Sequence, residues 1–191
     1  MAVKFRQQLK GPRLKLKRTL PTLEMAEMIF AVVDANREHL KPWLEWVSAT
    51  QRVEDTLKYL FDKEEETKQG KKIEYGIFIG PEYIGNIALF DISQTSQSAE
   101  LGYWLAASHT RQGYMTEAVQ VIEQYAFEQL KLNRLQIVCD ERNIGSAGVA
   151  KKAGYVLEGT LRQNAFSSHY QDLRNSLIFS KLRSEYQAKT Q

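Results

Sequence analysis

The chain has 191 residues, of which 43% are hydrophobic and one is a cysteine, which predicts one domain with a sizeable core and excludes an intramolecular disulfide framework. No apolar run approaches the roughly 20 residues of a membrane span, and no apolar stretch follows the basic N-terminus. We therefore expect neither a membrane span nor a signal peptide, and a cytoplasmic location. The net charge of +3 is uneven: the first 18 residues carry seven basic side chains and no acid, so the rest has 19 basic against 23 acidic residues.

Three parts follow from this composition. We expect a basic N-terminal arm over residues 1–12, one domain over 13–183 and a short tail over 184–191, since no repeat or Pro/Gly/Ser-rich linker divides the chain. The arm is either a solvated segment leading into the first strand or a contact for the ribosome, without sequence-specific nucleic-acid binding. The acidic remainder would attract a cationic peptide.

The first half of the chain alternates a strand with helices. Leu14 and Leu16 alternate with lysines, which predicts a half-buried strand. Residues 22–36 have a helical apolar face behind Thr22 as N-cap. A Pro-interrupted aromatic segment follows over residues 39–46, and a charged helix over about 53–70.

The second half predicts strands at 73–79, 83–90 and 99–105, with a turn at Gly80-Pro81. An amphipathic helix runs from Met115 to about Lys131, followed by a strand at 134–140, a short helix at 143–153 and a closing strand pair at 155–161 and 170–182. This order indicates an α+β fold of three α/β/α layers around a mostly antiparallel mixed sheet.

An anion-binding loop is predicted where strand 99–105 leads into the long helix. The residues concerned are Arg111, Gln112, Gly113, Tyr114, Met115 and Thr116. A glycine opening directly into a helix aims free backbone N–H groups and the positive end of the helix dipole at one point, which suits a pyrophosphate. The Arg111 guanidinium could add a bidentate contact.

A second loop opens the next helix at Asn143-Ile144-Gly145-Ser146. Asn143 is a natural N-cap, and Ser146 lies on the exposed first turn, where it serves either as a capping helper or in a cleft beside the strand. The single cysteine, Cys139, is interpreted as a small core residue. The three histidines have no metal-like spacing, and we expect no metal site.

Together with Glu158-Gly159-Thr160-Leu161-Arg162, these two loops resemble the acyl-CoA-binding core of the GCN5-related N-acetyltransferases (GNAT). Their residues are most similar to those of the RimJ/RimL group, which acetylates ribosomal proteins. The resemblance covers residues 13–182. The chain departs from the family pattern Arg/Gln-x-x-Gly-x-Gly/Ala at Thr110 and Met115. Ala165 stands where that group has an acidic residue.

The resemblance implies a single-domain GNAT fold whose splayed strand pair holds acetyl-CoA. Pantetheine would lie along Gly102, Tyr103, Trp104 and Leu105. A glycine inside a strand marks either a bulge or a close approach of a ligand. Asn143 would contact the cofactor, Ser146 would protonate the leaving thiolate, and Lys152 would meet the 3′-phosphate.

The acceptor side would include Glu100, which binds or deprotonates the incoming amine directly or through water, or else forms only a cross-strand contact. Trp43 and Trp46 would line the substrate pocket or belong to the core. The implied function is acetyl transfer from acetyl-CoA to an amine, foremost the N-terminal α-amine of a ribosomal or other protein. A small-molecule amine acetyltransferase and a non-catalytic acyl-CoA-binding or ribosome-associated module are the alternatives, and a homodimer is left open.

Overall fold

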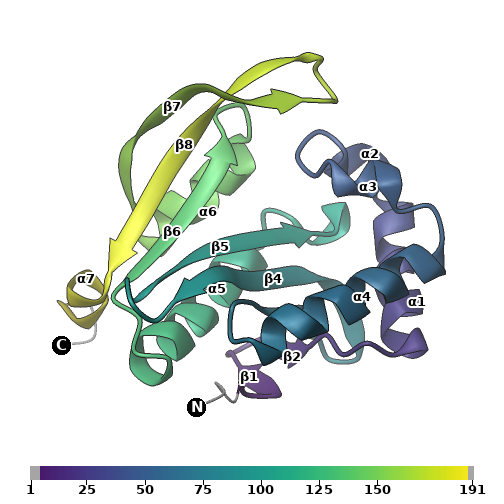
Figure 1. Cartoon of the computed structure of the whole chain (residues 1–191), viewed down its shortest axis with the longest axis horizontal. Coiled ribbons are helices and arrows are strands. Elements are labelled where there is room, and N and C mark those ends of the chain that lie inside the picture. Colours follow the sequence, from purple (N-terminus) through teal and green to yellow (C-terminus); the bar gives the residue numbers. More distant parts are fainter. Residues whose placement is uncertain (1–4, 189–191) are drawn as a thin grey trace.

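One mixed sheet of eight strands organises the chain (Figure 1), and the computed structural model describes residues 5–188. The strands are β1 (Gln8–Lys10), β2 (Lys15–Arg18), β3 (Ile73–Ile79), β4 (Glu82–Ser93), β5 (Ser98–Leu105), β6 (Arg134–Asp140), β7 (Val156–Ser167) and β8 (Asp172–Leu182). Their order in the sheet is β1-β2-β3-β4-β5-β6-β8-β7, and every neighbouring pair is antiparallel except β5 and β6. The expected mostly antiparallel mixed sheet is confirmed.

Helices cover both faces of this sheet, as Figure 1 shows. The helices are α1 (Leu23–Ala35), α2 (Arg37–Leu40), α3 (Trp46–Ala49), α4 (Val53–Lys68), α5 (Tyr114–Gln124), α6 (Ile144–Ala153) and α7 (Arg183–Ala188). One core cluster joins α1 and α4 to Phe78 and Tyr83, and the other joins α5 and α6 to the opposite face. Within residues 5–188, no helix is long and apolar enough to cross a membrane.

Local sequence signals explain where the helices begin and end. The Thr22 side chain accepts a hydrogen bond from the Met25 N–H, and Ala26, Ile29 and Val33 form the buried stripe of α1. Gly154 ends α6 in the left-handed conformation, with φ = 85°. The helix expected to reach Lys131 continues past α5 as one wide π-helical turn over Tyr125–Gln129.

The two ends of the chain are more structured than the sequence predicted. The described part of the expected arm, residues 5–12, contains β1, and Phe5 and Leu9 lie in the main core. β1 has only three residues, which give too short an alternation for a strand to be recognised from sequence. The expected tail begins inside α7, and residues 1–4 and 189–191 lie outside the described part, so the domain limits stay a prediction.

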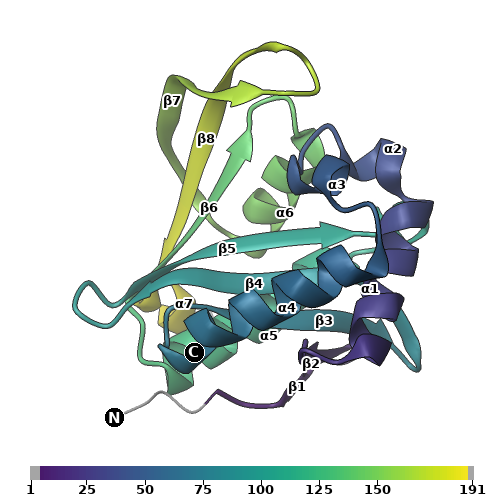
Figure 2. The same ribbon diagram turned by 45° about the vertical axis from the view of Figure 1, so that its right-hand side comes forward.

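The parallel pair of β5 and β6 separates early, which gives the sheet the V shape of Figures 1 and 2. Only Ser98–Arg134, Ala99–Leu135 and Glu100–Gln136 are paired. Beyond them β5 stays with β4 as far as Leu105, and β6 stays with β8 as far as Asp140. The two halves of the sheet therefore diverge towards the C-terminal ends of β5 and β6.

A buried lysine ties the two halves together. Lys181 on β8 donates to Glu123 Oε2 on α5 at 2.8 Å and to the Ala153 carbonyl at the end of α6, also at 2.8 Å. Both charged side chains are almost fully buried, 3% and 2% exposed. A buried ion pair is sensitive to the loss of one partner, because the remaining charge keeps its desolvation penalty.

We therefore expect Lys181→Ala to lower the free energy of unfolding by about 3–5 kcal/mol, because the Glu123 carboxylate loses the cation that faces it. Urea denaturation at pH 7 measures the change, and Lys151→Ala on the exposed side of α6 is the control. A Lys181→Ala variant as stable as the control would show that this pair does not join the two halves.

Candidate functional site

A cavity of about 750 Å3 lies where β5 and β6 have separated. Its walls come from both strands, from the loop before α5, from the first turns of α6 and from the segment around α2. The lining residues are 39, 40, 43, 44, 101–105, 109–111, 113–116, 137–140, 143–146, 148, 149, 152 and 174. This volume is typical of a site for a small molecule or cofactor.

The edge of β5 beyond Glu100 is one wall of the cavity. Residues 101–105 pair with β4 on one side, and their other side has no strand partner. Their free N–H and C=O groups can therefore bind an extended ligand that carries amide groups, as they would bind another strand. Gly102, Trp104 and Leu105, predicted for the cofactor arm, lie on this wall.

The glycine at position 102 does not mark a bulge, which was one of its two expected roles. A Cβ there would lie 2.7 Å from the Phe90 ring of β4, and the register around Ala88–Gly102 is regular, without a bulge. Gly102 therefore makes room for a neighbouring side chain in the sheet. Its position on the cavity wall is as predicted.

The loop before α5 presents its backbone to the cavity. Arg111 and Gly113 have left-handed φ angles of 61° and 81°, and α5 begins at Tyr114. Alternating helical and left-handed residues turn successive N–H groups inwards, and the first N–H groups of α5 have no partner within the helix. Of the six predicted loop residues, all but Gln112 line the cavity. The Gln112 amide donates instead to the Ser108 carbonyl at 2.8 Å.

The first turn of α6 meets β5 across the cavity. The Asn143 side chain accepts from the Ser146 N–H at 2.9 Å, which is the expected N-cap. Ser146 Oγ donates to the Tyr103 hydroxyl at 3.2 Å, and that hydroxyl donates to the Ser146 carbonyl at 3.2 Å. Asn143, Ser146 and Lys152 all line the cavity, as predicted.

Tyr103 was expected along the cofactor arm, but sequence reasoning gave its hydroxyl no role. Burial raises the pKa of its hydroxyl, against the opposing effect of the Ser146 hydrogen bond, so the group stays protonated at neutral pH. The sequence pattern that could have indicated this role is the hydroxyl of Tyr103 among otherwise apolar residues on the same face of β5, namely Ala99, Leu101 and Leu105. Nearby, burial also raises the pKa of Cys139, which keeps the thiol uncharged and weakly nucleophilic.

Glu100 lies at the closed end of the V, outside the cavity lining. Its carboxylate accepts from Gln136 Nε2 at 2.8 Å across the last paired rung. Burial raises the pKa of Glu100, the Gln136 hydrogen bond lowers it, and the charge of Asp91 raises it further. If Glu100 deprotonates the acceptor amine, it would therefore act through water.

The aromatic residues divide between the cavity and its rim. Trp43 lines the cavity, and its ring lies 6.2 Å from that of Tyr170 on the β7–β8 hairpin. Trp46 is 42% exposed and packs against Trp104 at 6.2 Å, behind the cavity wall. Arg174 of β8 also lines the cavity, and neither the aromatic nor the charge pattern of the sequence indicated it.

Among residues 5–188, the candidate metal ligands form no cluster. No three histidine, cysteine, aspartate or glutamate side chains in this range are arranged to hold an ion. The cavity is lined by backbone amides, hydroxyls and basic side chains, and its one carboxylate, Asp140, is paired with Arg142 at 2.9 Å. This lining suits a negatively charged organic ligand.

Replacing Gln136 with leucine should raise the pKa of Glu100 further, because the substitution removes a hydrogen bond that favours the carboxylate. NMR titration of the side-chain carboxyl measures this, with Gln120→Leu on the exposed face of α5 as control. An unchanged pKa in Gln136→Leu would mean that this hydrogen bond does not determine the ionisation of Glu100.

Comparisons with known proteins agree with this geometry. The sequence profile of the Acetyltransferase (GNAT) domain matches residues 13–156. The probable N-acetyltransferase YjcK of Bacillus subtilis is 37% identical over 115 residues, which are 59% of this chain and 64% of YjcK, so the match spans slightly less than two thirds of that relative. The ribosomal-protein-serine acetyltransferase of Escherichia coli is 32% identical over 138 residues, 72% of this chain and 77% of that enzyme.

Among solved structures, the chain is similar to RimL, the ribosomal L7/L12 alpha-N-protein acetyltransferase, in complex with coenzyme A. The TM-score is 0.87 at 22% identity, over 93% of this chain and 99% of RimL. At this identity the likeness establishes the fold. With the profile match over most of the sequence, it shows that the chain belongs to the GNAT acetyltransferase family.

Proposed function

We propose that this protein transfers the acetyl group of acetyl-CoA to an amine, foremost the N-terminal α-amine of a protein. The observation that carries the proposal is the unpaired edge of β5, which faces a cavity ending at the loop 111–116. The edge suits the amide-containing pantetheine arm, and the loop suits a pyrophosphate. Membership of an acetyltransferase family supports the same donor.

Different residues around the cavity would bind different parts of acetyl-CoA. Gly102, Trp104 and Leu105 would lie along pantetheine, and the N–H groups of Gly113–Thr116 would surround the pyrophosphate with Arg111 beside them. Asn143 would keep α6 in place, and Lys152 would meet the 3′-phosphate. These residues would therefore offer backbone amides to pantetheine and N–H groups or positive charges to the phosphates.

The chemistry is a direct attack within a ternary complex. The amine nitrogen bonds to the thioester carbon, the carbon–sulfur bond breaks, and an N–H of β5 stabilises the oxyanion. The amine proton leaves to water, which relays it towards Glu100. Ser146 gives its proton to the leaving thiolate and regains one through the Tyr103 hydroxyl, which is 3.2 Å away.

Two features support an α-amine as acceptor. The body of the chain, which carries more acidic than basic residues, would attract a basic peptide behind its N-terminus. Similarity to the E. coli ribosomal-protein-serine acetyltransferase supports a ribosomal protein and a cytoplasmic location. Trp43 would contact the acceptor directly, whereas Trp46 would support the wall through Trp104.

A small-molecule amine is the second candidate acceptor. Ala165 favours it, because the chain has no carboxylate at the place where the ribosomal-protein group carries one. A non-catalytic acyl-CoA-binding or ribosome-associated module is the third reading. Measuring acetyl-CoA turnover with a panel of peptides and small amines separates all three.

A homodimer is also part of the proposal. β7 is an edge strand, and its residues Val156, Leu157 and Leu161 are 43–54% exposed. Exposed apolar side chains along a sheet edge are typical of an interaction surface. Sedimentation at micromolar concentration would detect the dimer, and a monomer there would refute it.

Gly113→Val should abolish acetyl-CoA binding while the fold persists. A side chain at φ = 81° strains the loop, and its Cβ would lie 3.3 Å from the Arg13 guanidinium. Isothermal titration calorimetry measures the affinity. The control is Gly80→Val, which introduces a side chain at φ = 58° in the β3–β4 turn, with no atom within 4 Å of the new Cβ. Wild-type affinity in Gly113→Val would refute the phosphate-loop assignment.

We expect faster transfer to a peptide α-amine than to a lysine side chain. Their reference pKa values are about 7.7–8.0 and 10.4, so deprotonation at pH 7 costs about 1 and about 4.6 kcal/mol. The Glu100 carboxylate, acting through water, is a weak base that could deprotonate the α-amine but not the lysine amine. The measurement is kcat/KM for one basic peptide with a free N-terminus and blocked lysine, and for the reverse. Faster transfer to lysine, or to neither, would favour a small-molecule acceptor.

A further inference from the structure

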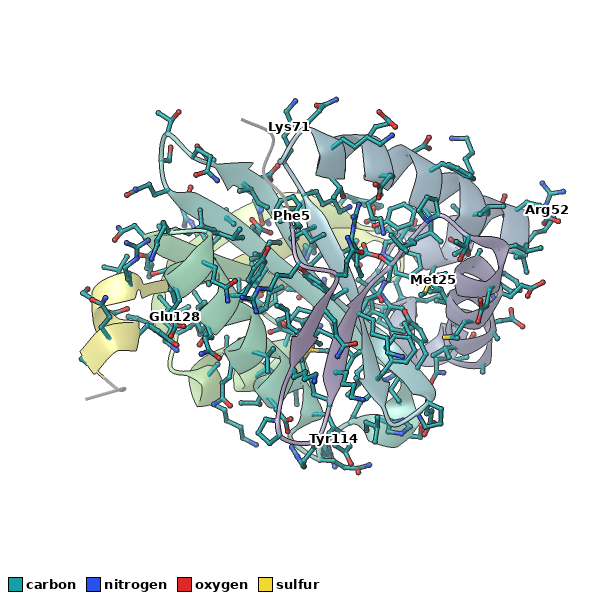
Figure 3. All side chains as sticks on the ribbon, turned by 90° about the horizontal axis from the view of Figure 1, so that it is seen from below. Phe5, Met25, Arg52, Lys71, Tyr114 and Glu128 are labelled. Carbon is teal, nitrogen blue, oxygen red and sulfur yellow. The ribbon has the colours of Figure 1, made fainter. Side chains whose placement is uncertain are left out.

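Arg13 lies in the turn between β1 and β2, against the outer side of the loop that leads into α5. We propose that Arg13 is a positioning residue, which holds the loop 111–114 in the shape that binds the pyrophosphate of the donor. The inference rests on the proposed function and extends it to the N-terminal hairpin. Figure 3 shows Tyr114, the first residue of α5, beside the β1–β2 turn.

One side of Arg13 is anchored to α5. Its backbone N–H donates to Glu117 Oε1 at 2.7 Å, and its Nε donates to Glu117 Oε2 at 2.7 Å. The Leu14 N–H donates to the same Oε1 at 3.3 Å. Glu117 is 8% exposed and lies in the first turn of α5, so the hairpin and the start of the helix are fixed to each other.

The other side of the guanidinium touches the loop on both sides of Gly113. Nη1 donates to the Gln112 carbonyl at 3.1 Å, and Cζ lies 4.6 Å from the centre of the Tyr114 ring. A Cβ built on Gly113 would lie 3.3 Å from Nη2. A single planar group therefore contacts the two residues that flank Gly113, Gln112 and Tyr114, in a fork geometry that a lysine ammonium does not reproduce.

The loop needs such support because its backbone is strained. Arg111 has φ = 61°, and a left-handed conformation costs a non-glycine residue about 1–2 kcal/mol. A strained backbone persists only where its surroundings hold it. The Gln112 carbonyl lies between the two left-handed residues, and Arg13 bonds to that carbonyl.

The contribution of Arg13 is geometric more than electrostatic. Its charge is paired with Glu117 at 2.7 Å, and half of its side chain is exposed to water, which screens the charge. Arg13 is also outside the lining of the cavity. Losing it should therefore loosen the loop without removing a group that touches the donor.

The test compares two donors that differ in the pyrophosphate. Arg13→Ala should raise KM for acetyl-CoA roughly tenfold or more, the size expected for losing a hydrogen bond to a charged group. The same variant should leave kcat/KM unchanged for S-acetyl-pantetheine, which has no pyrophosphate. A merely structural defect would lower activity with both donors alike. Lys15→Ala, an equal loss of charge at an exposed position of β2, should behave as wild type.

Arg13→Lys separates the effect of the positive charge from that of the guanidinium geometry. It also replaces Arg13→Ala in the test if the alanine variant fails to fold. Lysine keeps the charge but has one nitrogen in place of the separate Nε and Nη1 donors that reach Glu117 and Gln112, so its KM for acetyl-CoA should lie between those of wild type and Arg13→Ala. Arg13 variants that match wild type with both donors would overturn this inference alone. A wild-type protein that uses both donors equally well would overturn the phosphate-loop assignment and, with it, the inference.

Discussion

The early end of the β5–β6 pairing is the constraint on which the rest of the site depends. Three rungs join the strands, and beyond Glu100–Gln136 each strand keeps only its outer partner. The separation leaves one edge of β5 without its backbone partners inside the protein. An unpaired strand edge is costly when it is buried, and a bound ligand with amide groups can satisfy it. The fold thus leaves backbone groups of β5 unpaired, and the amide groups of acetyl-CoA could pair with them.

The helices turn this opening into a directed site. α5 and α6 both begin at the cavity, so two positive helix ends face the same volume. The first N–H groups of α5 have no partner within the helix, whereas the Ser146 N–H of α6 is capped by Asn143. At the other end of α5 and α6, the buried Lys181–Glu123 pair and the Ala153 carbonyl tie the two halves of the sheet together. The opening can therefore be wide at one end while the closed end is rigid.

Sequence reasoning recovered the elements whose signals are local. Helix caps at Thr22 and Asn143, the glycine before α5 and the order of strands are each encoded within a few residues. The β1 strand, the Tyr103–Ser146 contact and the place of Arg13 depend on residues far apart in the chain, 43 positions for the first contact and 104 for Arg13–Glu117. Gly102 lies on the cavity wall without the bulge that was one of its two explanations, and the Phe90 ring that leaves no room for a side chain there belongs to another strand.

Amide hydrogen exchange with and without acetyl-CoA tests the central claim most directly, because the claim concerns backbone N–H groups. Ligand should slow exchange at residues 102–105 of β5 and at 113–116 of the loop and first turn of α5, while β3, already paired on both sides, exchanges as before. Protection at both segments would support a donor lying along the edge of β5 with its pyrophosphate on the loop. Protection at neither segment, or only at the distant β7–β8 hairpin, would contradict it.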